Sequence, residues 1–195
     1  MPAELQAILF DMDGLLVDTE PHFYEAHRSV FAEHGVEIPI EEYARVWIIR
    51  GARTQDEAMR RGLRADPEAV RAEVMRRFRA SVARGLVLMP GARETLARAH
   101  ARFRTAVVTN TTREEATLVL GRLGLSPLLD RVVAREDYER AKPAPDAYRA
   151  GAEALGAAPG ACLALEDSPR GVSAAAAAGI RCVAVSGGHS WIGQR

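Results

Sequence analysis

The side chains best suited to chemistry stand directly after short apolar runs of the sequence. Asp11 and Asp13 follow residues 7–10, Thr109 and Asn110 follow residues 105–108, and Glu166 and Asp167 follow residues 162–165. If these runs are parallel strands, their carboxyl ends meet at one edge of a sheet, where ligands of such sheets bind. Carboxylates gathered there would repel one another, and a divalent cation relieves that repulsion. A ligand set made only of oxygen atoms favours a hard ion such as Mg²⁺.

One basic residue differs from all the others. The chain has 26 basic residues, and every one except Lys142 is an arginine. Arginine and lysine are nearly interchangeable at an exposed position, but not at a site that needs a compact ammonium group. Lys142 follows the third predicted strand, so it can reach the same edge of the sheet. An ammonium group, Mg²⁺, hydroxyls and amides together suit a bound phosphate group.

Five β-rich runs separated by helical patterns predict an α/β fold on a parallel sheet. The predicted strands are residues 7–10, 105–108, 131–134, 162–165 and 181–185. Their near-continuous apolar character is typical of strands covered on both faces. The predicted helices are residues 92–102, 112–123, 143–155 and 169–178. This alternation favours parallel strands with helices on both faces of the sheet.

The segment after the first strand contains only helical patterns. They cover residues 21–34, 40–47 and 54–61, and a further helix begins at Pro67 behind an Asp66 N-cap. Apolar residues then recur every four positions, at Val70, Val74, Phe78 and Val82. An all-helical insertion of this length predicts a separate cap domain over residues 18–87, with the catalytic core in residues 1–17 and 88–195.

The composition excludes several classes of protein. The 26 acidic residues balance the basic ones without any basic block, so no nucleic-acid partner is expected. The chain has neither a P-loop before its lysine nor a G-x-G-x-x-G run after a strand. No run approaches the ~18 apolar residues that span a bilayer, so no membrane partner is expected.

The acidic residues near the N-terminus and the two cysteines bear on the expected cellular compartment. Glu4, Asp11 and Asp13 argue against a signal peptide, so we expect a cytoplasmic protein. Cys162 and Cys182 lie in strand-like runs and are expected to be small core residues. The sequence does not fix the oligomeric state, and we favour a monomer.

Four motifs occur in order across nearly the whole chain. They are D-M-D-G-L-L-V-D-T-E at residues 11–20, V-V-T-N at 107–110, K-P-A-P-D at 142–146 and L-E-D-S-P-R-G at 165–171. The ordered set resembles the haloacid dehalogenase-like superfamily. The cap resembles the helical type of the branch that holds β-phosphoglucomutase, phosphoglycolate phosphatase and the sugar-phosphate phosphatases. The resemblance implies a Rossmann-like α/β core with an inserted helical cap.

The resemblance also implies roles in catalysis. Asp11 would be the nucleophile that takes the phosphoryl group as an aspartyl-phosphate. Asp13 would act as general acid to the leaving oxygen and then as general base to water. Lys142 would pair with Asp11 and offset the charge that develops in the transition state.

Binding roles follow from the same resemblance. Phosphate oxygens would be bound by Thr109 and by the backbone amide of Asn110. Glu166 would be either a metal ligand or a partner of the ligands. The implied Mg²⁺ ligands are Asp11, the backbone carbonyl of Asp13, and Asp167.

The residue types favour one reaction over its relatives. Asp13 favours phosphoryl transfer to oxygen, because the resembling dehalogenases lack an acid at this position. The T-E-P run at residues 19–21 looks like that of sugar-phosphate phosphatases, and His22 is offset from the position of the mutase histidine. Arg53 stands one sequence position away from the place where the resembling mutases have an arginine in the cap. It is therefore either a substrate contact or a surface residue.

We therefore expect a Mg²⁺-dependent phosphatase that acts on a small phosphorylated metabolite, such as a sugar phosphate or a phosphoglycolate-like compound. A phosphomutase of the β-phosphoglucomutase type is the alternative, followed by a phosphonate hydrolase or a catalytically silent phosphate-binding relative. Resembling chains usually continue past the fifth strand, whereas residues 186–195 end this chain soon after it. We expect an edge strand left open in this way to be prone to pairing with another chain.

Overall fold

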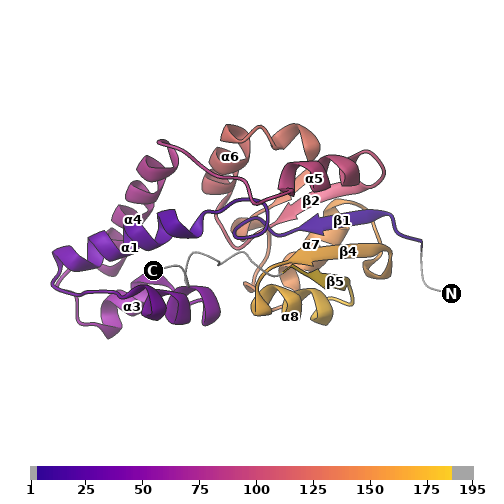
Figure 1. Ribbon diagram of the computed structural model, residues 1–195. Helices are drawn as coiled ribbons and strands as arrows, with labels where there is room; N and C mark the ends of the chain where they lie inside the picture. Colours follow the sequence, from indigo (N-terminus) through magenta and orange to yellow (C-terminus); the bar gives the residue numbers. More distant parts are fainter. Residues whose placement is uncertain (1–3, 186–195) are drawn as a thin grey trace. The chain divides into compact units, whose positions relative to one another are not determined.

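The computed structural model describes residues 4–185, which divide into two compact units (Figure 1). The sheet unit holds residues 4–18 and 86–185, and the helical unit holds Thr19–Gly85. The expectation about the end of the chain falls on residues 186–195, which lie outside the described residues. No helix in the described range is long and apolar enough to cross a membrane.

The sheet unit is built on five parallel strands in the order β3-β2-β1-β4-β5. They are β1 (Ala7–Phe10), β2 (Arg104–Val108), β3 (Arg131–Val133), β4 (Cys162–Glu166) and β5 (Arg181–Ala184). The predicted parallel α/β fold is confirmed, and each strand lies within one residue of its predicted bounds.

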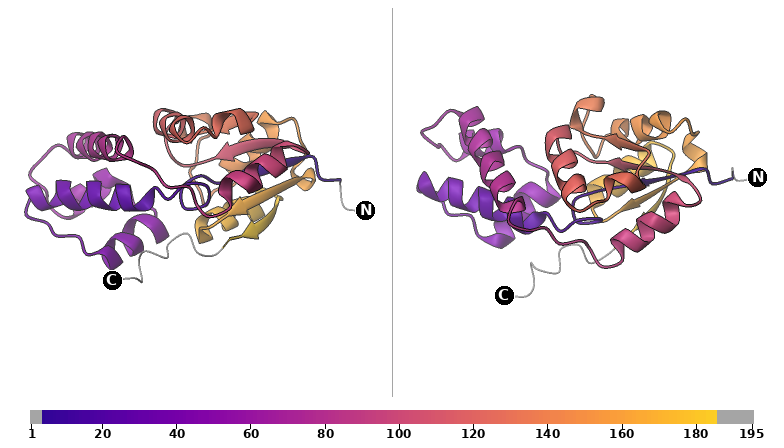
Figure 2. Two further views of the ribbon diagram at one scale, coloured as in Figure 1. Left: turned by 45° about the horizontal axis from the view of Figure 1, so that its top comes forward. Right: turned by 90° about the horizontal axis from the view of Figure 1, so that it is seen from above.

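Helices flank both faces of this sheet (Figures 1 and 2). Helices α5 (Ala92–His100) and α6 (Arg113–Arg122) lie on one face, and α7 (Asp146–Ala154) and α8 (Pro169–Ala177) lie on the other. Three short 3₁₀ turns join elements of this unit, at Ser126–Leu128, Arg135–Asp137 and Pro159–Ala161. Helix α7 begins three residues later than predicted, because residues that precede a proline avoid the helical conformation and Pro143 and Pro145 both stand there.

The core beneath α7 and α8 is made of alternate strand residues. Ala7 and Leu9 of β1 pack with Ala106 and Val108 of β2 in one buried cluster with both helices. A Cβ atom at Gly151 of α7 would lie 2.7 Å from Val108 Cγ2, so only glycine lets this helix come so close to the sheet.

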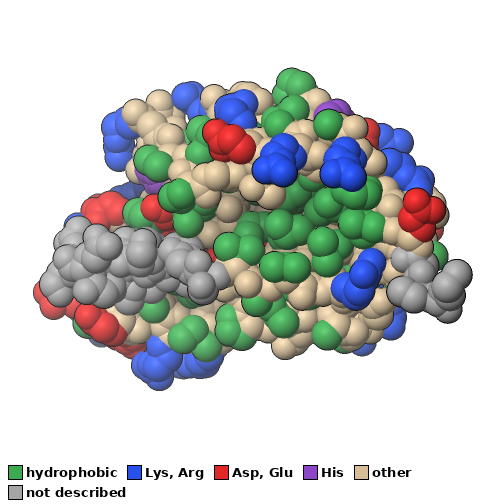
Figure 3. Space-filling view, turned by 45° about the vertical axis from the view of Figure 1, so that its right-hand side comes forward, with side chains coloured by type: hydrophobic (Ala, Val, Ile, Leu, Met, Phe, Trp, Pro, Cys, Tyr) green, Lys and Arg blue, Asp and Glu red, His purple; other side chains and the backbone are tan. Residues whose placement is uncertain are grey.

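The prediction that every strand is covered on both faces is wrong for β5. Val183 is 48% exposed, Val185 just after the strand is 40% exposed, and Cys182 is half-buried instead of core. The reason is position: β5 forms the edge of the sheet and pairs with β4 alone among the described strands. Hydrophobic side chains gather on the face of the molecule in Figure 3, with Lys and Arg side chains around them.

The helical unit contains α1 (Glu20–Glu33), α2 (Ile40–Tyr43), the π-helix η1 (Ala44–Ile49), α3 (Thr54–Arg60) and α4 (Pro67–Val82). The predicted apolar stripe of α4 is buried, and Phe78 stacks on Phe23 of α1 with ring centroids 3.8 Å apart. Asp66 caps α4 by accepting the backbone N–H of Glu68. The second predicted helix widens into η1, where Trp47 stacks on Tyr43 with ring centroids 5.5 Å apart.

His27 is buried in the centre of this unit. Its Nδ1 lies 2.8 Å from the carbonyl oxygen of Phe23 and its Nε2 lies 2.9 Å from Thr54 Oγ1. A carbonyl can only accept, so Nδ1 carries the proton and Nε2 of the neutral ring accepts from the threonine hydroxyl. Burial lowers the pKa of His27 to about 4, although its hydrogen bond to Phe23 acts the other way. Burial thus favours the neutral imidazole of His27 in the folded helical unit.

We expect the free energy of unfolding to fall between pH 6.5 and pH 4 because of His27. Its pKa is lower in the folded chain than in the unfolded one, so the unfolded chain binds the proton more readily over this range. The stabilisation is complete above pH 6.5 and is lost as the pH falls towards 4, at a cost of about 3 kcal/mol. Urea unfolding of the wild type and of His27→Gln between pH 6.5 and pH 4 measures this change in the free energy of unfolding. The control is His34→Gln, because His34 is exposed. Parallel pH curves for wild type and His27→Gln would contradict it.

Candidate active site

The acidic residues predicted for the site lie at the carboxyl ends of β1 and β4. The path of the chain across the sheet reverses between these two strands, and ligands of parallel sheets bind beside such a point. Asp11 extends β1, with its backbone N–H donating to the carbonyl of Leu165 at 3.0 Å. Gly14 then turns the chain with a φ of +82°, a conformation that other residue types rarely adopt.

Two hydroxyl groups hold the carboxylate of Asp13. Thr109 Oγ1 donates to Asp13 Oδ2 at 3.1 Å, and Thr111 Oγ1 donates to the same oxygen at 2.8 Å. Thr109 Oγ1 also accepts the backbone N–H of Thr111 at 3.0 Å. The loop after β2 therefore fixes the direction in which Asp13 presents its carboxylate.

The ammonium group of Lys142 is buried and fully hydrogen-bonded. Its Nζ donates to Asp11 Oδ1 at 2.5 Å, to Glu166 Oε1 at 2.6 Å and to the carbonyl of Val108 at 2.8 Å. An ammonium group has three N–H bonds, and these three acceptors use all of them. Only 3% of Lys142 is exposed. The single lysine of the chain thus lies between two carboxylates of the sheet edge.

The backbone around Lys142 is held from two sides. Asn110 Oδ1 accepts the backbone N–H of Lys142 at 3.1 Å, and the Tyr138 hydroxyl lies 2.9 Å from the same oxygen. On the other side, the guanidinium of Arg170 donates to the carbonyl of Lys142. The side chain of Asn110 therefore positions the lysine loop.

Both oxygens of Glu166 are occupied by donors from the protein. Oε1 accepts from Lys142 and, at 2.8 Å, from the Tyr148 hydroxyl. Oε2 accepts from Ser168 Oγ at 3.0 Å and lies 3.3 Å from the Ser168 backbone nitrogen. A carboxylate offers about four lone-pair positions, so these donors account for its capacity. The arrangement favours Glu166 as the partner of Lys142.

The surroundings of the site shift the pKa values of Asp11, Asp167 and Lys142. Burial, and next the negative charge of Glu166, raise the pKa of Asp11 well above its ordinary value, although Lys142 opposes them. The same two causes raise the pKa of Asp167 to about 7. Burial lowers the pKa of Lys142, but Asp11, Tyr148 and Glu166 outweigh burial and hold it well above its ordinary value. This edge of the sheet thus carries more negative charge than one ammonium group balances.

Three carboxylates at this edge of the sheet lie close enough together to hold a cation. One oxygen from each of Asp11, Glu166 and Asp167 lies within 4.8 Å of the others. The donors are all hard oxygen atoms, which suits Mg²⁺. Burial is the main cause of the raised pKa of Asp11 and of Asp167, and the neighbouring carboxylates add to it.

Arg53 belongs to the helical unit, whereas the other predicted site residues belong to the sheet unit. It stands just before α3 and forms a two-point ion pair with Asp56, at 3.1 and 3.0 Å. Its side chain is 69% exposed. Its role as a substrate contact stays a prediction.

Sequence reasoning missed three residues that complete the site: Thr111, Tyr148 and Ser168. A signal existed for two of them. Tyr148 falls on the buried side of a predicted helix, where a phenol needs a hydrogen-bond partner. Ser168 stands before a proline at a helix start, which is typical of an N-cap, and its Oγ does accept the backbone N–H of Gly171.

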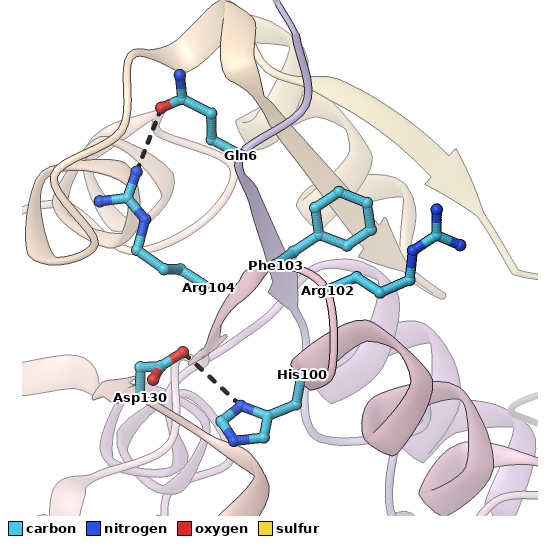
Figure 4. A pocket seen from close by; sticks show the side chains of 6 residues that line it. All are labelled: Gln6, His100, Arg102, Phe103, Arg104 and Asp130. Atoms are coloured by element: carbon cyan, nitrogen blue, oxygen red, sulfur yellow. Dashed lines mark hydrogen bonds and ion pairs between the residues drawn. The ribbon is translucent and has the colours of Figure 1, made fainter.

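A hollow lies at the amino ends of the strands, opposite the candidate active site (Figure 4). Its volume is about 440 Å³, and its lining residues are Gln6, His100, Arg102, Phe103, Arg104 and Asp130. Arg104 donates to Gln6 Oε1 at 3.2 Å, and His100 Nδ1 lies 3.8 Å from Asp130 Oδ2. These two pairs connect residues at the amino ends of the strands and lie apart from the acidic cluster.

Comparison with known proteins identifies one family. Residues 5–179 match the haloacid dehalogenase-like hydrolases. The protein CbbY of Rhodobacter capsulatus is 32% identical over 192 residues, which cover 92% of this chain and 85% of CbbY. The fructose-1-phosphate phosphatase YqaB of Escherichia coli K12 is 32% identical over 183 residues, which cover 91% of this chain and 95% of YqaB.

A solved structure agrees with this result. The crystal structure of a CbbY variant from Rhodobacter sphaeroides, in complex with xylulose-1,5-bisphosphate, has a TM-score of 0.83 at 29% identity. The similarity covers 94% of this chain and 87% of that one. A family match over most of the chain, with relatives above 30% identity and the same fold, shows that this chain belongs to the haloacid dehalogenase-like hydrolases, as its four motifs predicted.

Proposed function

We propose that this chain is a Mg²⁺-dependent phosphatase of small phosphorylated metabolites, with a phosphorylated sugar as the favoured substrate. The observation that carries the proposal is the contact of Asp11 Oδ1 with Lys142 Nζ at 2.5 Å, inside a cluster of carboxylates at the carboxyl ends of the strands. The names of two relatives support the substrate class, since one is a fructose-1-phosphate phosphatase and the other was crystallised with xylulose-1,5-bisphosphate. The protein is proposed to act in the cytoplasm.

The cation would be held by Asp11, Asp167 and the backbone carbonyl of Asp13. The oxygens of Glu166 are taken by Lys142, Tyr148 and Ser168, so we place it beside the ligands. When bound, Mg²⁺ would offset carboxylate and phosphate charge and hold their oxygens together.

The first chemical step would use two aspartates. A carboxylate oxygen of Asp11 attacks phosphorus, the bond from phosphorus to the leaving oxygen breaks, and Asp13 gives its proton to that oxygen. The products are the dephosphorylated alcohol and an aspartyl-phosphate on Asp11. The Lys142 ammonium, held against Asp11, offsets negative charge as the bonds exchange.

The second step returns the enzyme to its starting state. The Asp13 carboxylate takes a proton from water, the water oxygen attacks phosphorus, and the bond to Asp11 breaks to release inorganic phosphate. Thr109 and Thr111 hold the Asp13 carboxylate in one direction for both proton transfers. Thr109 and the backbone amide of Asn110 are proposed to bind phosphate oxygens, and Arg53 is proposed to contact the substrate.

Release of inorganic phosphate from a defined panel tests this function. The panel contains fructose-1-phosphate, xylulose-1,5-bisphosphate, glucose-1-phosphate, phosphoglycolate and a nucleoside monophosphate, each with Mg²⁺ and with a chelator. We expect release from at least one sugar phosphate with Mg²⁺, and loss of that release when the chelator removes the metal.

Two other results would replace this proposal. Conversion of glucose-1-phosphate to glucose-6-phosphate without free phosphate would make the protein a mutase. Failure to release phosphate from any member of the panel would defeat the phosphatase proposal.

A further inference from the structure

We propose that Tyr148 is a positioning residue that holds Lys142 against Asp11. It does so through its hydroxyl, which fixes Glu166, and through its ring, which lies beneath the ammonium group. This inference deepens the proposed function, because it concerns the residue that would offset charge on Asp11. Tyr148 lies outside the four sequence motifs that suggested the site.

The hydroxyl of Tyr148 reaches Lys142 through a shared acceptor. Glu166 Oε1 accepts from Tyr148 at 2.8 Å and from Lys142 at 2.6 Å, so both of its lone pairs are used. Tyr148 and Glu166 are both fully buried, and water does not reach either group. Removal of the hydroxyl would leave one lone pair of a buried carboxylate unfilled, and the carboxylate would turn towards its remaining donors.

The ring of Tyr148 touches the lysine directly. Lys142 Nζ lies 4.8 Å from the ring centroid, within the range of a cation–π contact. The same side chain therefore contacts both members of the Lys142–Glu166 ion pair. Among the donors to Glu166, Tyr148 alone adds such a ring contact on the lysine within the described part of the chain.

The shape of the surroundings leaves Glu166 little room. Its carboxylate lies over the first turn of α8, where a Cβ atom at Gly171 would come within 1.8 Å of the Glu166 Cδ. Ser168 holds Oε2 at 3.0 Å from the side of that turn. Gly171 thus provides the space, Ser168 fixes one oxygen, and Tyr148 fixes the oxygen that faces the lysine.

The single lysine gives a direct readout of this arrangement. Lysine labelled with ¹³C at Cε and ¹⁵N at Nζ produces one side-chain signal, that of Lys142, in the whole protein. Protons above an aromatic ring are shifted by its ring current, so the signal reports the place of Lys142 over Tyr148 in the metal-free protein. The measurement does not depend on catalytic activity.

The variant Tyr148→Phe removes the hydroxyl and keeps the ring. We expect the Lys142 signal to move, and kcat with the best substrate of the panel to fall about tenfold while KM changes less than about twofold. Tyr24→Phe is the matched control, because the Tyr24 hydroxyl donates to the carbonyl of Ile38 in the helical unit. We expect that control to leave the Lys142 signal unchanged.

A Lys142 signal and a kcat that both stay at wild-type values in Tyr148→Phe would overturn the proposal, whatever the change in melting temperature. If Tyr148→Phe fails to fold, a measurement on the wild-type protein tests the contact between Lys142 and Tyr148 instead. A nuclear Overhauser effect between the Lys142 ε-protons and the Tyr148 ring supports the proposal, and its absence overturns it. A wild-type protein that releases no phosphate would defeat the proposed function, while the lysine signal would still decide the role of Tyr148.

Discussion

Asp11→Asn is expected to reduce phosphate release at least about 10⁴-fold. The amide of asparagine is a poor nucleophile, and it removes the charge that Lys142 contacts at 2.5 Å. The same change relieves crowding among Asp11, Glu166 and Asp167, whose oxygens lie within 4.8 Å of one another. We therefore expect the metal-free variant to melt no lower than wild type, which separates a loss of chemistry from a loss of folding.

The measurement is steady-state phosphate release with the best substrate of the panel, together with thermal unfolding in the presence of a chelator. Asp66→Asn is the matched control, because Asp66 is exposed at the start of α4 and asparagine caps a helix as well as aspartate does. Retention of more than about 1% of wild-type turnover by Asp11→Asn would show that another group is the nucleophile.

The fold could be predicted well from the sequence because its signals are local. Short apolar runs predict the five strands and their parallel arrangement, whereas the strand order β3-β2-β1-β4-β5 was not predicted and comes from the structure. The prediction of burial fails at β5, because an apolar run does not indicate whether a strand lies at the centre or at the edge of a sheet. Val183 looks like a core residue by composition and is 48% exposed because it lies at the edge of the sheet.

The site is harder to predict where its geometry depends on distant elements. Residue types alone bring Asp11 and Lys142 together as candidates, and the structure places them in contact. The orientation of Glu166 depends on Tyr148 from α7 and on the space that Gly171 of α8 leaves because it has no Cβ atom. Neither contact can be predicted from the spacing of residues in the sequence. The sequence alone therefore could not show that Glu166 contacts Lys142.

Lys142→Arg is expected to reduce kcat at least about 100-fold, although it keeps the positive charge. Three acceptors at 2.5, 2.6 and 2.8 Å surround one nitrogen atom, which suits an ammonium group and leaves no place for a planar guanidinium with five donors. The larger group would also overpack a position that is only 3% exposed, at a cost of about 1–3 kcal/mol in stability.

The variant Lys142→Met tests whether the charge or the shape of the side chain matters. If only the charge mattered, Lys142→Arg would keep most of the activity that Lys142→Met loses. The geometry instead predicts that both variants are severely impaired. Arg28→Lys, at an exposed ion pair with Glu25, measures the ordinary effect of exchanging the two residue types and should be near neutral. Near-wild-type turnover in Lys142→Arg would mean that the one lysine among 26 basic residues is an accident of composition.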